Sequence, residues 1–244
     1  MGGLVGTTGP QGSRGMPCGA SVGDLFPGTL AALGIVSAVH AARRTGDGQF
    51  VDVAMYDAVL GLCENIVYKY AGEGRVEHPK GFGHPALSPF DIYETQDGAA
   101  AIAAPTEPQW ELLCGIIGRP DLVQDGRSCN VFERVANRDF VNGVILSWTR
   151  SRTTREVVAA LARQVPVGPV NTAADIFADP HAKVRGMLVE VEQPGNNRPI
   201  TLAGPAIKLT GTPSGIYRRP PRIGEHTDEI LAEASRLSQR KETS

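Results

Sequence analysis

The segment Leu25–Arg44 constrains the possible folds more strongly than any other part of this sequence. It is predicted to be a helix with Pro27 in its first turn, where a missing backbone N–H costs nothing, and with Gly46 as its C-terminal stop. Arg43 and Arg44 stand at its negative end. The body of this helix is apolar on nearly every face, and such a helix is buried between layers rather than lying on a surface. We therefore expect a layered fold that encloses it.

Length and charge limit the class of protein. The chain has 244 residues, of which 41% are hydrophobic and 20% charged, enough for one large domain or two small ones. Its net charge of -2 comes without a basic patch, so we expect no nucleic-acid partner.

The longest apolar run, Gly28 to Val39, is too short to span a bilayer, and the N-terminus lacks a signal core. Four scattered cysteines without a C-x-x-C pair suit a reducing compartment. We expect a soluble, cytoplasmic protein with no membrane partner.

The rest of the chain shows helix and strand patterns on either side of one composition break, the glycine- and proline-rich loop 72–89. Before the break we expect a short strand over Gly48–Met55 and a helix over Asp57–Tyr70. After it, "FDIYETQDGAAAIAA" predicts two strands joined by a Gln96-Asp97-Gly98 turn. Further helices are expected over 108–118 (with a Thr106/Gln109 capping box), 131–149, 154–164, 173–178 and 228–237. An extended crossing is expected over 165–172, with later strands in "MLVEVEQ" and "ITLAGPAIKL".

Asp24, in "GASVGDLFPGTLAALG", immediately precedes the apolar helix and supports two interpretations. Aspartate is a favoured N-cap, because its oxygen accepts a hydrogen bond from a free first-turn N–H. The same position also suits a nucleophile, because a helix N-terminus stabilises an anion and lowers the pKa of a carboxylate, which then stays ionised and able to attack. The residues alone leave both interpretations open.

The loop "HPKGFGHP" carries His78, Gly81, Gly83 and His84. Two histidines in a loop without a spaced carboxylate do not define a metal site, so we expect no metal. The Gly-x-Gly lacks the strand-to-helix context of a phosphate-binding loop. A mobile lid and a plain domain connection both fit this loop.

Several stretches together resemble the family III CoA-transferases, the CaiB/BaiF type that includes formyl-CoA transferase. "GASVGDLFPGTLAALGIVSAVHAARRTGDGQFVDVAMYDAVL" resembles the family's catalytic-aspartate segment with its buried helix, and "PFDIYETQDGAAAIAAPTEPQWELLCGIIGRPDL" the start of its small domain. "VPVGPVNTAADIFADPHAKVRGMLVEV" and "RRPPRIGEHTDEIL" resemble the stretches that return to the large domain. The resemblance covers essentially the whole chain.

The resemblance implies an α/β fold: the remnant of a Rossmann-like large domain, a smaller α+β domain, and a C-terminal return to the large domain. It places the catalytic-aspartate segment at 1–75, the small domain with its lid loop at 76–185, and the return segment at 186–244. Family members usually carry about a domain's worth of chain before this region, holding most CoA contacts. We expect the chain to be a truncated product, the result of a mis-called start, or one subunit of a split enzyme, with exposed apolar faces on the Leu25–Arg44 helix.

The resemblance also implies a chemistry and partners. The family's nucleophilic aspartate falls on Asp24, which would attack an acyl-CoA thioester and pass CoA to a free carboxylic acid through anhydride and thioester intermediates. No metal or redox cofactor is implied, since CoA arrives as part of the substrate. Gly81, Gly83 and His84 occupy the place of the family's lid loop. Family members are interlocked dimers, so we expect a homodimer.

Two alternatives remain beside the transferase, which we favour. In the related α-methylacyl-CoA racemases, the aspartate acts as an acid/base and a glutamate assists proton transfer at the acyl α-carbon. "TEPQW" puts Glu107 at that position, where the dipole of a helix start would also favour an acid without any chemistry. The other alternative is an inactive module that serves only binding or assembly.

Overall fold

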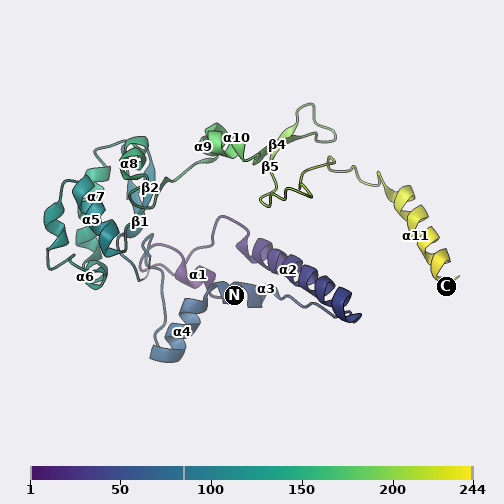
Figure 1. Cartoon of the computed structure of the whole chain (residues 1–244), viewed down its shortest axis with the longest axis horizontal. Helices are drawn as coiled ribbons and strands as arrows, with labels where there is room; N and C mark the ends of the chain where they lie inside the picture. The colour runs from purple at the N-terminus through teal and green to yellow at the C-terminus, as the bar shows by residue number, and fades with distance from the viewer. Residues whose placement is uncertain (1, 85, 243–244) are drawn as a thin grey trace. The chain divides into compact units, whose positions relative to one another are not determined.

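The structure is a computed structural model that describes residues 2–84 and 86–242 (Figure 1). Contacts divide the chain into two compact units, Met1–Val170 and Asn171–Ser244, which are described separately. The fold is mixed α/β, as expected, and every strand pair of the described residues is antiparallel. The three-segment division expected from the sequence stays a prediction.

A three-stranded sheet organises residues 90–170. Strand β1 (Phe90–Glu94) pairs with β2 (Ala99–Ala103), and β2 pairs with β3 (Val167–Pro169), in the order β1-β2-β3. The predicted hairpin is confirmed, with Ile92 opposite Ala101 and a turn closed by the Thr95 N–H, which donates to the Gly98 carbonyl at 3.0 Å. The expected extended crossing supplies β3 at the other edge of β2.

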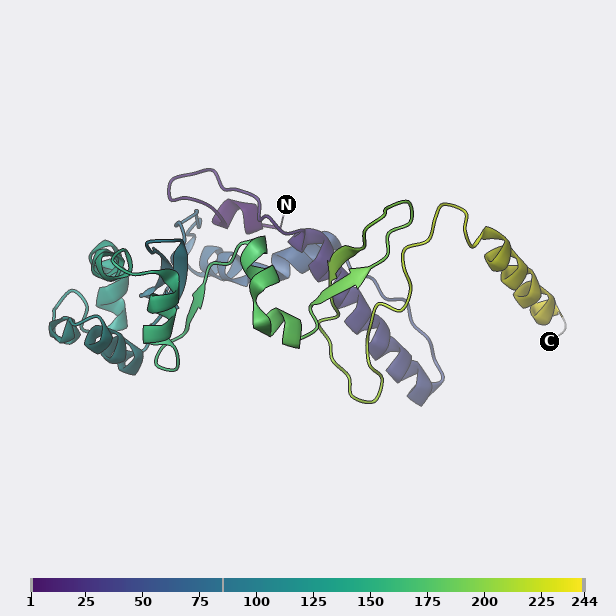
Figure 2. The same cartoon turned by 90° about the horizontal axis from the view of Figure 1, so that it is seen from above.

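One face of this sheet is covered by helices (Figure 2). They are α7 (Arg138–Thr149), which contacts β1, and α8 (Thr154–Leu161), which contacts β2 and β3. Helix α5 (Glu107–Ile116) packs against α8 and the 3-10 turn η1 (Pro120–Val123), and α6 (Val131–Ala136) packs against α7. Ala100 and Ile102 of β2 are buried while Ala101 between them is exposed, since successive strand residues point to opposite faces. The buried pair packs in one core with apolar residues of the helices, including Trp110, Leu113, Ile145, Val157 and Leu161.

The helix ends show where local sequence patterns were sufficient to predict the boundary of a helix. Thr106 and Gln109 form the predicted capping box at the start of α5. A second box, Thr153 with Glu156, starts α8 and was not anticipated. The single helix expected over 131–149 is divided at Asn137, whose backbone leaves the helical region and whose side chain donates to the Glu133 carbonyl at 3.0 Å. Polar side chains of this kind compete for backbone groups, which explains the break.

Residues 2–84 carry four helices: α1 (Leu4–Thr7), α2 (Val22–Thr45), α3 (Met55–Leu62) and α4 (Glu64–Glu73). The predicted strand over Gly48–Met55 is wrong, because this segment runs without joining a sheet of the described residues and Met55 already begins α3. The predicted helix over Asp57–Tyr70 is two helices, with the backbone leaving helical geometry at Cys63. Helix α3 packs against α2 and contacts α1.

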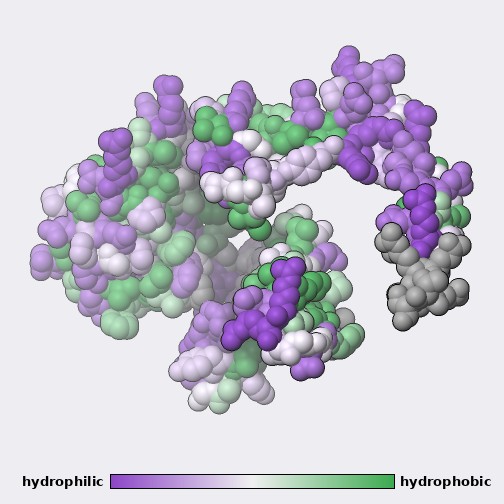
Figure 3. Space-filling view, turned by 45° about the vertical axis from the view of Figure 1, so that its right-hand side comes forward, coloured by the Kyte–Doolittle hydropathy of each residue, from purple (hydrophilic) through white to green (hydrophobic). Residues whose placement is uncertain are grey.

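Helix α2 is largely bare. Pro27 is the buried residue of this helix, and five large apolar side chains are exposed along it: Leu25, Leu33, Ile35, Val36 and Val39. The described residues do not bury α2 between two layers, although its apolar body predicted such burial. The expected exposure of its apolar faces is confirmed, and hydrophobic side chains are visible at the surface in Figure 3. Helix α2 is long and apolar enough to cross a membrane, but the core helices of soluble proteins meet the same criteria. The run Gly28 to Val39, which by itself is too short to span a bilayer, lies within this 24-residue helix.

The unit Asn171–Ser244 consists of short elements. Helix α9 (Ala173–Ala178), with the predicted bounds, begins at a Thr172 cap and is followed by α10 (Pro180–Val184). Strands β4 (Leu188–Val191) and β5 (Ile200–Ala203) pair antiparallel, which confirms both predicted strands. The last helix, α11 (Thr227–Glu242), is longer than expected.

A buried arginine links the sheet to its helical layer. Arg134 of α6 is fully buried, and its guanidinium donates to the carbonyls of Ser88 (2.9 Å), Pro105 (2.9 Å) and Ser128 (3.2 Å). It also pairs with the carboxylate of Glu107 at 2.8 Å. These partners lie before β1, after β2, after η1 and at the start of α5, so one side chain connects four segments.

We expect Arg134→Met to lower the free energy of unfolding by about 3–5 kcal/mol, because it strands buried carbonyls and unpairs a carboxylate. Urea unfolding measures the change. Arg150→Met is the matched control, since it removes an ion pair with Glu94 in which both side chains are mostly exposed; its effect should stay within about 1 kcal/mol. Equal effects of the two substitutions would contradict the role assigned to Arg134.

Candidate functional site

Asp24 is the third residue of α2, inside its first turn. Of the two interpretations of Asp24, the one as an N-cap is wrong: the N-cap is Ser21, whose carbonyl accepts from the Asp24 N–H at 3.1 Å. The Asp24 side chain is exposed, and among the described residues its carboxylate has no hydrogen bond or ion pair. Its oxygens are thus free for another partner, at the positive end of a 24-residue helix.

Packing beneath the first turn fixes where Asp24 lies. Pro27 stands inside α2 and is buried, instead of occupying the first turn as predicted, and its missing N–H leaves the Gly23 carbonyl without a helical partner. Gly23 lies against α3, where an added Cβ would come within 3.9 Å of Val59. The start of α2 is therefore held by α3 on the side next to Asp24.

The loop around residue 81 is tied to the segment that leads to Asp24. The Gly81 N–H donates to the Gly9 carbonyl at 3.0 Å. Gly81 is exposed and has a φ of 82°, in the left-handed region that favours glycine. The structure thereby joins the predicted lid loop to the N-terminal segment through one backbone hydrogen bond.

Farther along, the same loop is fastened to α7 and β1. Arg138 donates to the carbonyls of His84 (2.6 Å) and Leu87 (3.2 Å), and Gly83 packs so closely on Arg138 that a Cβ would collide with the guanidinium. The His84 ring is half-buried and stacks on Phe90 with 5.2 Å between centroids. Burial, with the Arg138 charge, lowers the pKa of His84. Gly83, His84 and Leu87 are thus anchored, and the closing motion expected of a lid stays a prediction.

A charged cluster that was not predicted from the sequence lies beside this loop. The Glu77 carboxylate contacts Lys69 (3.2 Å), Arg75 (2.9 Å) and Lys80 (2.8 Å). Its hydrogen bond with Lys80 leads the causes that lower the pKa of Glu77 to about 2. Lys69 and Lys80 line a pocket of about 240 Å³ between α1, the α3–α4 junction and the loop, which Gly81 and Gly83 also line. Glu77 and Lys80 stand three residues apart, a spacing from which their ion pair could have been predicted. Nothing in the sequence indicated that Lys69 of α4 would join them.

Glu107 does not line this pocket and is paired with the buried Arg134. Its carboxylate accepts from Arg134 and from the Val131 N–H at 3.1 Å. The hydrogen bond with Arg134 is the main cause that lowers the pKa of Glu107. Both interactions favour the ionised carboxylate and hold the start of α5 against that of α6, so the side chain already has a structural role.

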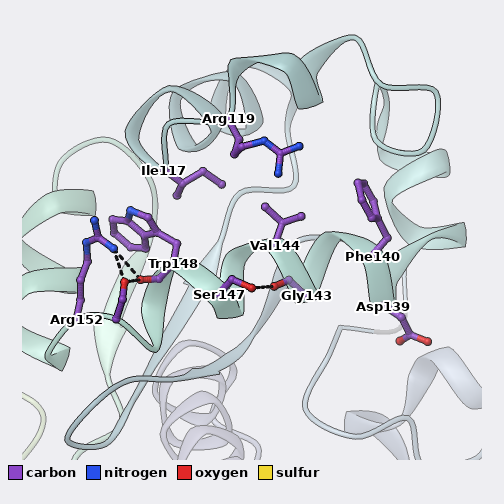
Figure 4. Close-up of a pocket in the computed structure, with 10 residues that line it drawn as sticks. Ile117, Arg119, Asp139, Phe140, Gly143, Val144, Ser147, Trp148 and Arg152 are labelled. Atoms are coloured by element: carbon purple, nitrogen blue, oxygen red, sulfur yellow. Dashed lines mark hydrogen bonds between the residues drawn. The ribbon is translucent and has the colours of Figure 1, made fainter.

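A larger groove, of about 610 Å³, runs along α7 (Figure 4). Ile117 and Arg119 face Val144 across it. Its two cations are already engaged: Arg119 pairs with Asp121 at 2.6 Å, and Arg152 donates to the Trp148 carbonyl at 2.9 Å. Among the described residues no group of three or more His, Cys, Asp or Glu side chains is arranged to hold a metal ion, and His78 lines the smaller pocket instead.

Comparisons with known proteins agree on one family. A family model described as "CoA-transferase family III" matches residues 1–227. The chain is 42% identical over 234 residues to the succinyl-CoA:mesaconate CoA-transferase of Haloarcula hispanica, covering 96% of this chain and 59% of that protein. It is 31% identical to the succinate–glutarate CoA-transferase of Agrobacterium fabrum, covering 96% and 58%. The crystal structure of a CAIB/BAIF family protein from Brucella suis superimposes with a TM-score of 0.77 at 30% identity, covering 95% and 60%. The chain therefore spans about 60% of the length of these relatives.

The two loop glycines give a testable pair. We expect Gly83→Ala to displace Arg138 and release the loop, so that the His84 N–H, which donates to Phe90, exchanges faster with solvent deuterium. Gly81→Ala should cost about 1–2 kcal/mol through its positive φ while leaving Arg138 in place. Hydrogen exchange resolved to peptides 82–90 measures both. Slow exchange in Gly83→Ala would show that Arg138 does not anchor the loop.

Proposed function

Because the chain belongs to CoA-transferase family III, we propose that Asp24 is the covalent nucleophile in the transfer of CoA from an acyl-CoA to a free carboxylic acid. The observation that carries the proposal is the state of Asp24. A residue kept as a cap would bind first-turn N–H groups, whereas this carboxylate is exposed and unpaired among the described residues. A carboxylate at a helix N-terminus is favoured as an anion, the form that attacks.

The reaction balances without any proton or electron transfer. The Asp24 carboxylate attacks the thioester carbonyl of the donor, the C–S bond breaks, and CoA leaves as thiolate from an acyl–aspartyl anhydride. The thiolate attacks the aspartyl carbonyl, which releases the donor acid and leaves an aspartyl-CoA thioester. The acceptor carboxylate attacks that thioester and expels the thiolate, which then takes the acceptor acyl group and restores Asp24. Each step exchanges one acyl bond for another, and no redox or metal cofactor takes part.

The substrate class follows from the relatives. The relatives from Haloarcula hispanica and Agrobacterium fabrum are named for succinyl-CoA and mesaconate and for succinate and glutarate, which are dicarboxylic acids of four or five carbons or derived from them. We extend that class to this chain. We also propose a homodimer as the working assembly.

A racemase is less well supported. It requires an acid/base that exchanges protons with the acyl α-carbon near neutral pH, and the ideal pKa of such a group lies near the working pH. The bond from Arg134 moves the pKa of Glu107 in the opposite direction. An inactive assembly module would form neither an aspartyl intermediate nor an exchanged α-proton.

Asp24→Asn should reduce CoA transfer by at least about 10³-fold, because the amide cannot form the anhydride. The natural protein at full length is incubated with succinyl-CoA, quenched with hydroxylamine, and mapped by peptide mass spectrometry. We expect the label on Asp24 and its loss in the variant. The free energy of unfolding should fall by no more than about 1 kcal/mol, since only a helix-dipole interaction is lost. Transfer that persists in Asp24→Asn would overturn the assignment.

Glu107→Gln should retain CoA transfer and lower stability slightly, because the amide still accepts one hydrogen bond from Arg134. The wild-type protein should leave the acyl α-proton of a 2-methylacyl-CoA unexchanged in deuterated water, as measured by NMR. Deuterium at that carbon, lost in Glu107→Gln, would instead identify a racemase.

A further inference from the structure

The pocket beside the loop lies against helix α3, as does the start of α2. Its wall includes Leu62 and Cys63, at the end of α3. These residues follow Val59 by about one helical turn, or about 5 Å along the helix. Val59 is the residue that faces Gly23, the neighbour of Asp24. The pocket and Gly23, the neighbour of the proposed nucleophile, thus contact the same helix, α3, at positions about one turn apart.

The pocket carries a surplus of positive charge. Lys69 and Lys80 line it with a single carboxylate, that of Glu77, so one net positive charge remains after pairing. The Lys69 side chain is only 17% exposed and Glu77 only 7%. Each ammonium has three N–H donors. Together the two groups carry more donors than the single carboxylate that they share can accept from. A partly desolvated cation with free donors favours an anion.

The pocket also has an apolar side and a limited size. Leu4 of α1 and Ile66 of α4 line it together with Leu62. Its volume of about 240 Å³ is below the roughly 300–1,000 Å³ of pockets for drug-sized ligands. A short carbon chain ending in a carboxylate matches this combination, whereas CoA itself does not.

Resting on the proposed transfer at Asp24, we propose that this pocket binds the distal carboxylate of a dicarboxylic substrate through the ammonium groups of Lys69 and Lys80. The two oxygens of Glu77 contact one lysine each, so a substrate carboxylate competes with Glu77 for the two ammonium groups. A monocarboxylic acid of the same length would place a methyl group against the cations and leave their donors unpaired. That difference is the kind of polar mismatch from which large discrimination between substrates arises.

Lys80→Gln tests the site without a buried substitution, because the Lys80 side chain is 45% exposed. Binding of succinate and of butyrate to the natural protein is measured by calorimetry. We expect succinate to bind the wild type at least tenfold more tightly than butyrate, and Lys80→Gln to weaken succinate about tenfold with butyrate unchanged. Lys208→Gln, an exposed lysine of the other unit, is the matched control and should change neither. Equal binding of the two acids by the wild type would overturn the proposal.

Glu77→Gln gives a result of opposite sign. Removing the carboxylate frees both ammonium groups, so succinate should bind more tightly although the protein becomes less stable. Succinate binding that is unchanged or weaker in this variant would contradict the proposal. The outcome is independent of the transfer chemistry: an unlabelled Asp24 refutes the proposed function, whereas a labelled Asp24 with unselective acid binding refutes only the lysine site.

Discussion

The guanidinium of Arg134 is the interaction on which the organisation of residues 88–161 depends. It satisfies three backbone carbonyls and one carboxylate, which belong to four different segments. A buried arginine is costly unless each donor is paired, so the four segments must reach their positions together. The apolar core of Trp110, Leu113, Ile145 and Leu161 then supplies the hydrophobic stabilisation, but the arginine fixes how the sheet meets its helices.

The candidate site depends on a different kind of contact. Glycines and backbone groups bring its parts together: Gly23 lies on Val59, and Gly81 donates to the Gly9 carbonyl. Side-chain charge then supplies the chemistry, through the unpaired carboxylate of Asp24 and the lysines around Glu77. The anchoring of Gly83 and His84 by Arg138 connects the loop of the site to the helical layer.

Much of the fold was predictable where the signal was local. The β1–β2 hairpin, the Thr106 capping box and the bounds of α9 follow from turn, cap and propensity patterns within a few residues. Predictions failed where two local tendencies competed. The breaks at Cys63 and Asn137 interrupt helices that periodicity treats as continuous, and Gly48–Ala54 alternates like a strand but finds no partner strand among the described residues. A strand needs a neighbour for its hydrogen bonds, and no alternation in one segment supplies it.

The sequence by itself determined the family resemblance, the apolar character of α2 and the identity of Asp24, because each rests on residue types in a fixed order. Tertiary structure decided what those residues do. It placed Asp24 inside the first turn of α2 instead of at its cap, paired Glu107 with the buried Arg134, and set Lys69 and Lys80 around one carboxylate. Charge pairing and burial act over a few ångströms in space between residues far apart in the chain, so spacing along the sequence does not reveal them.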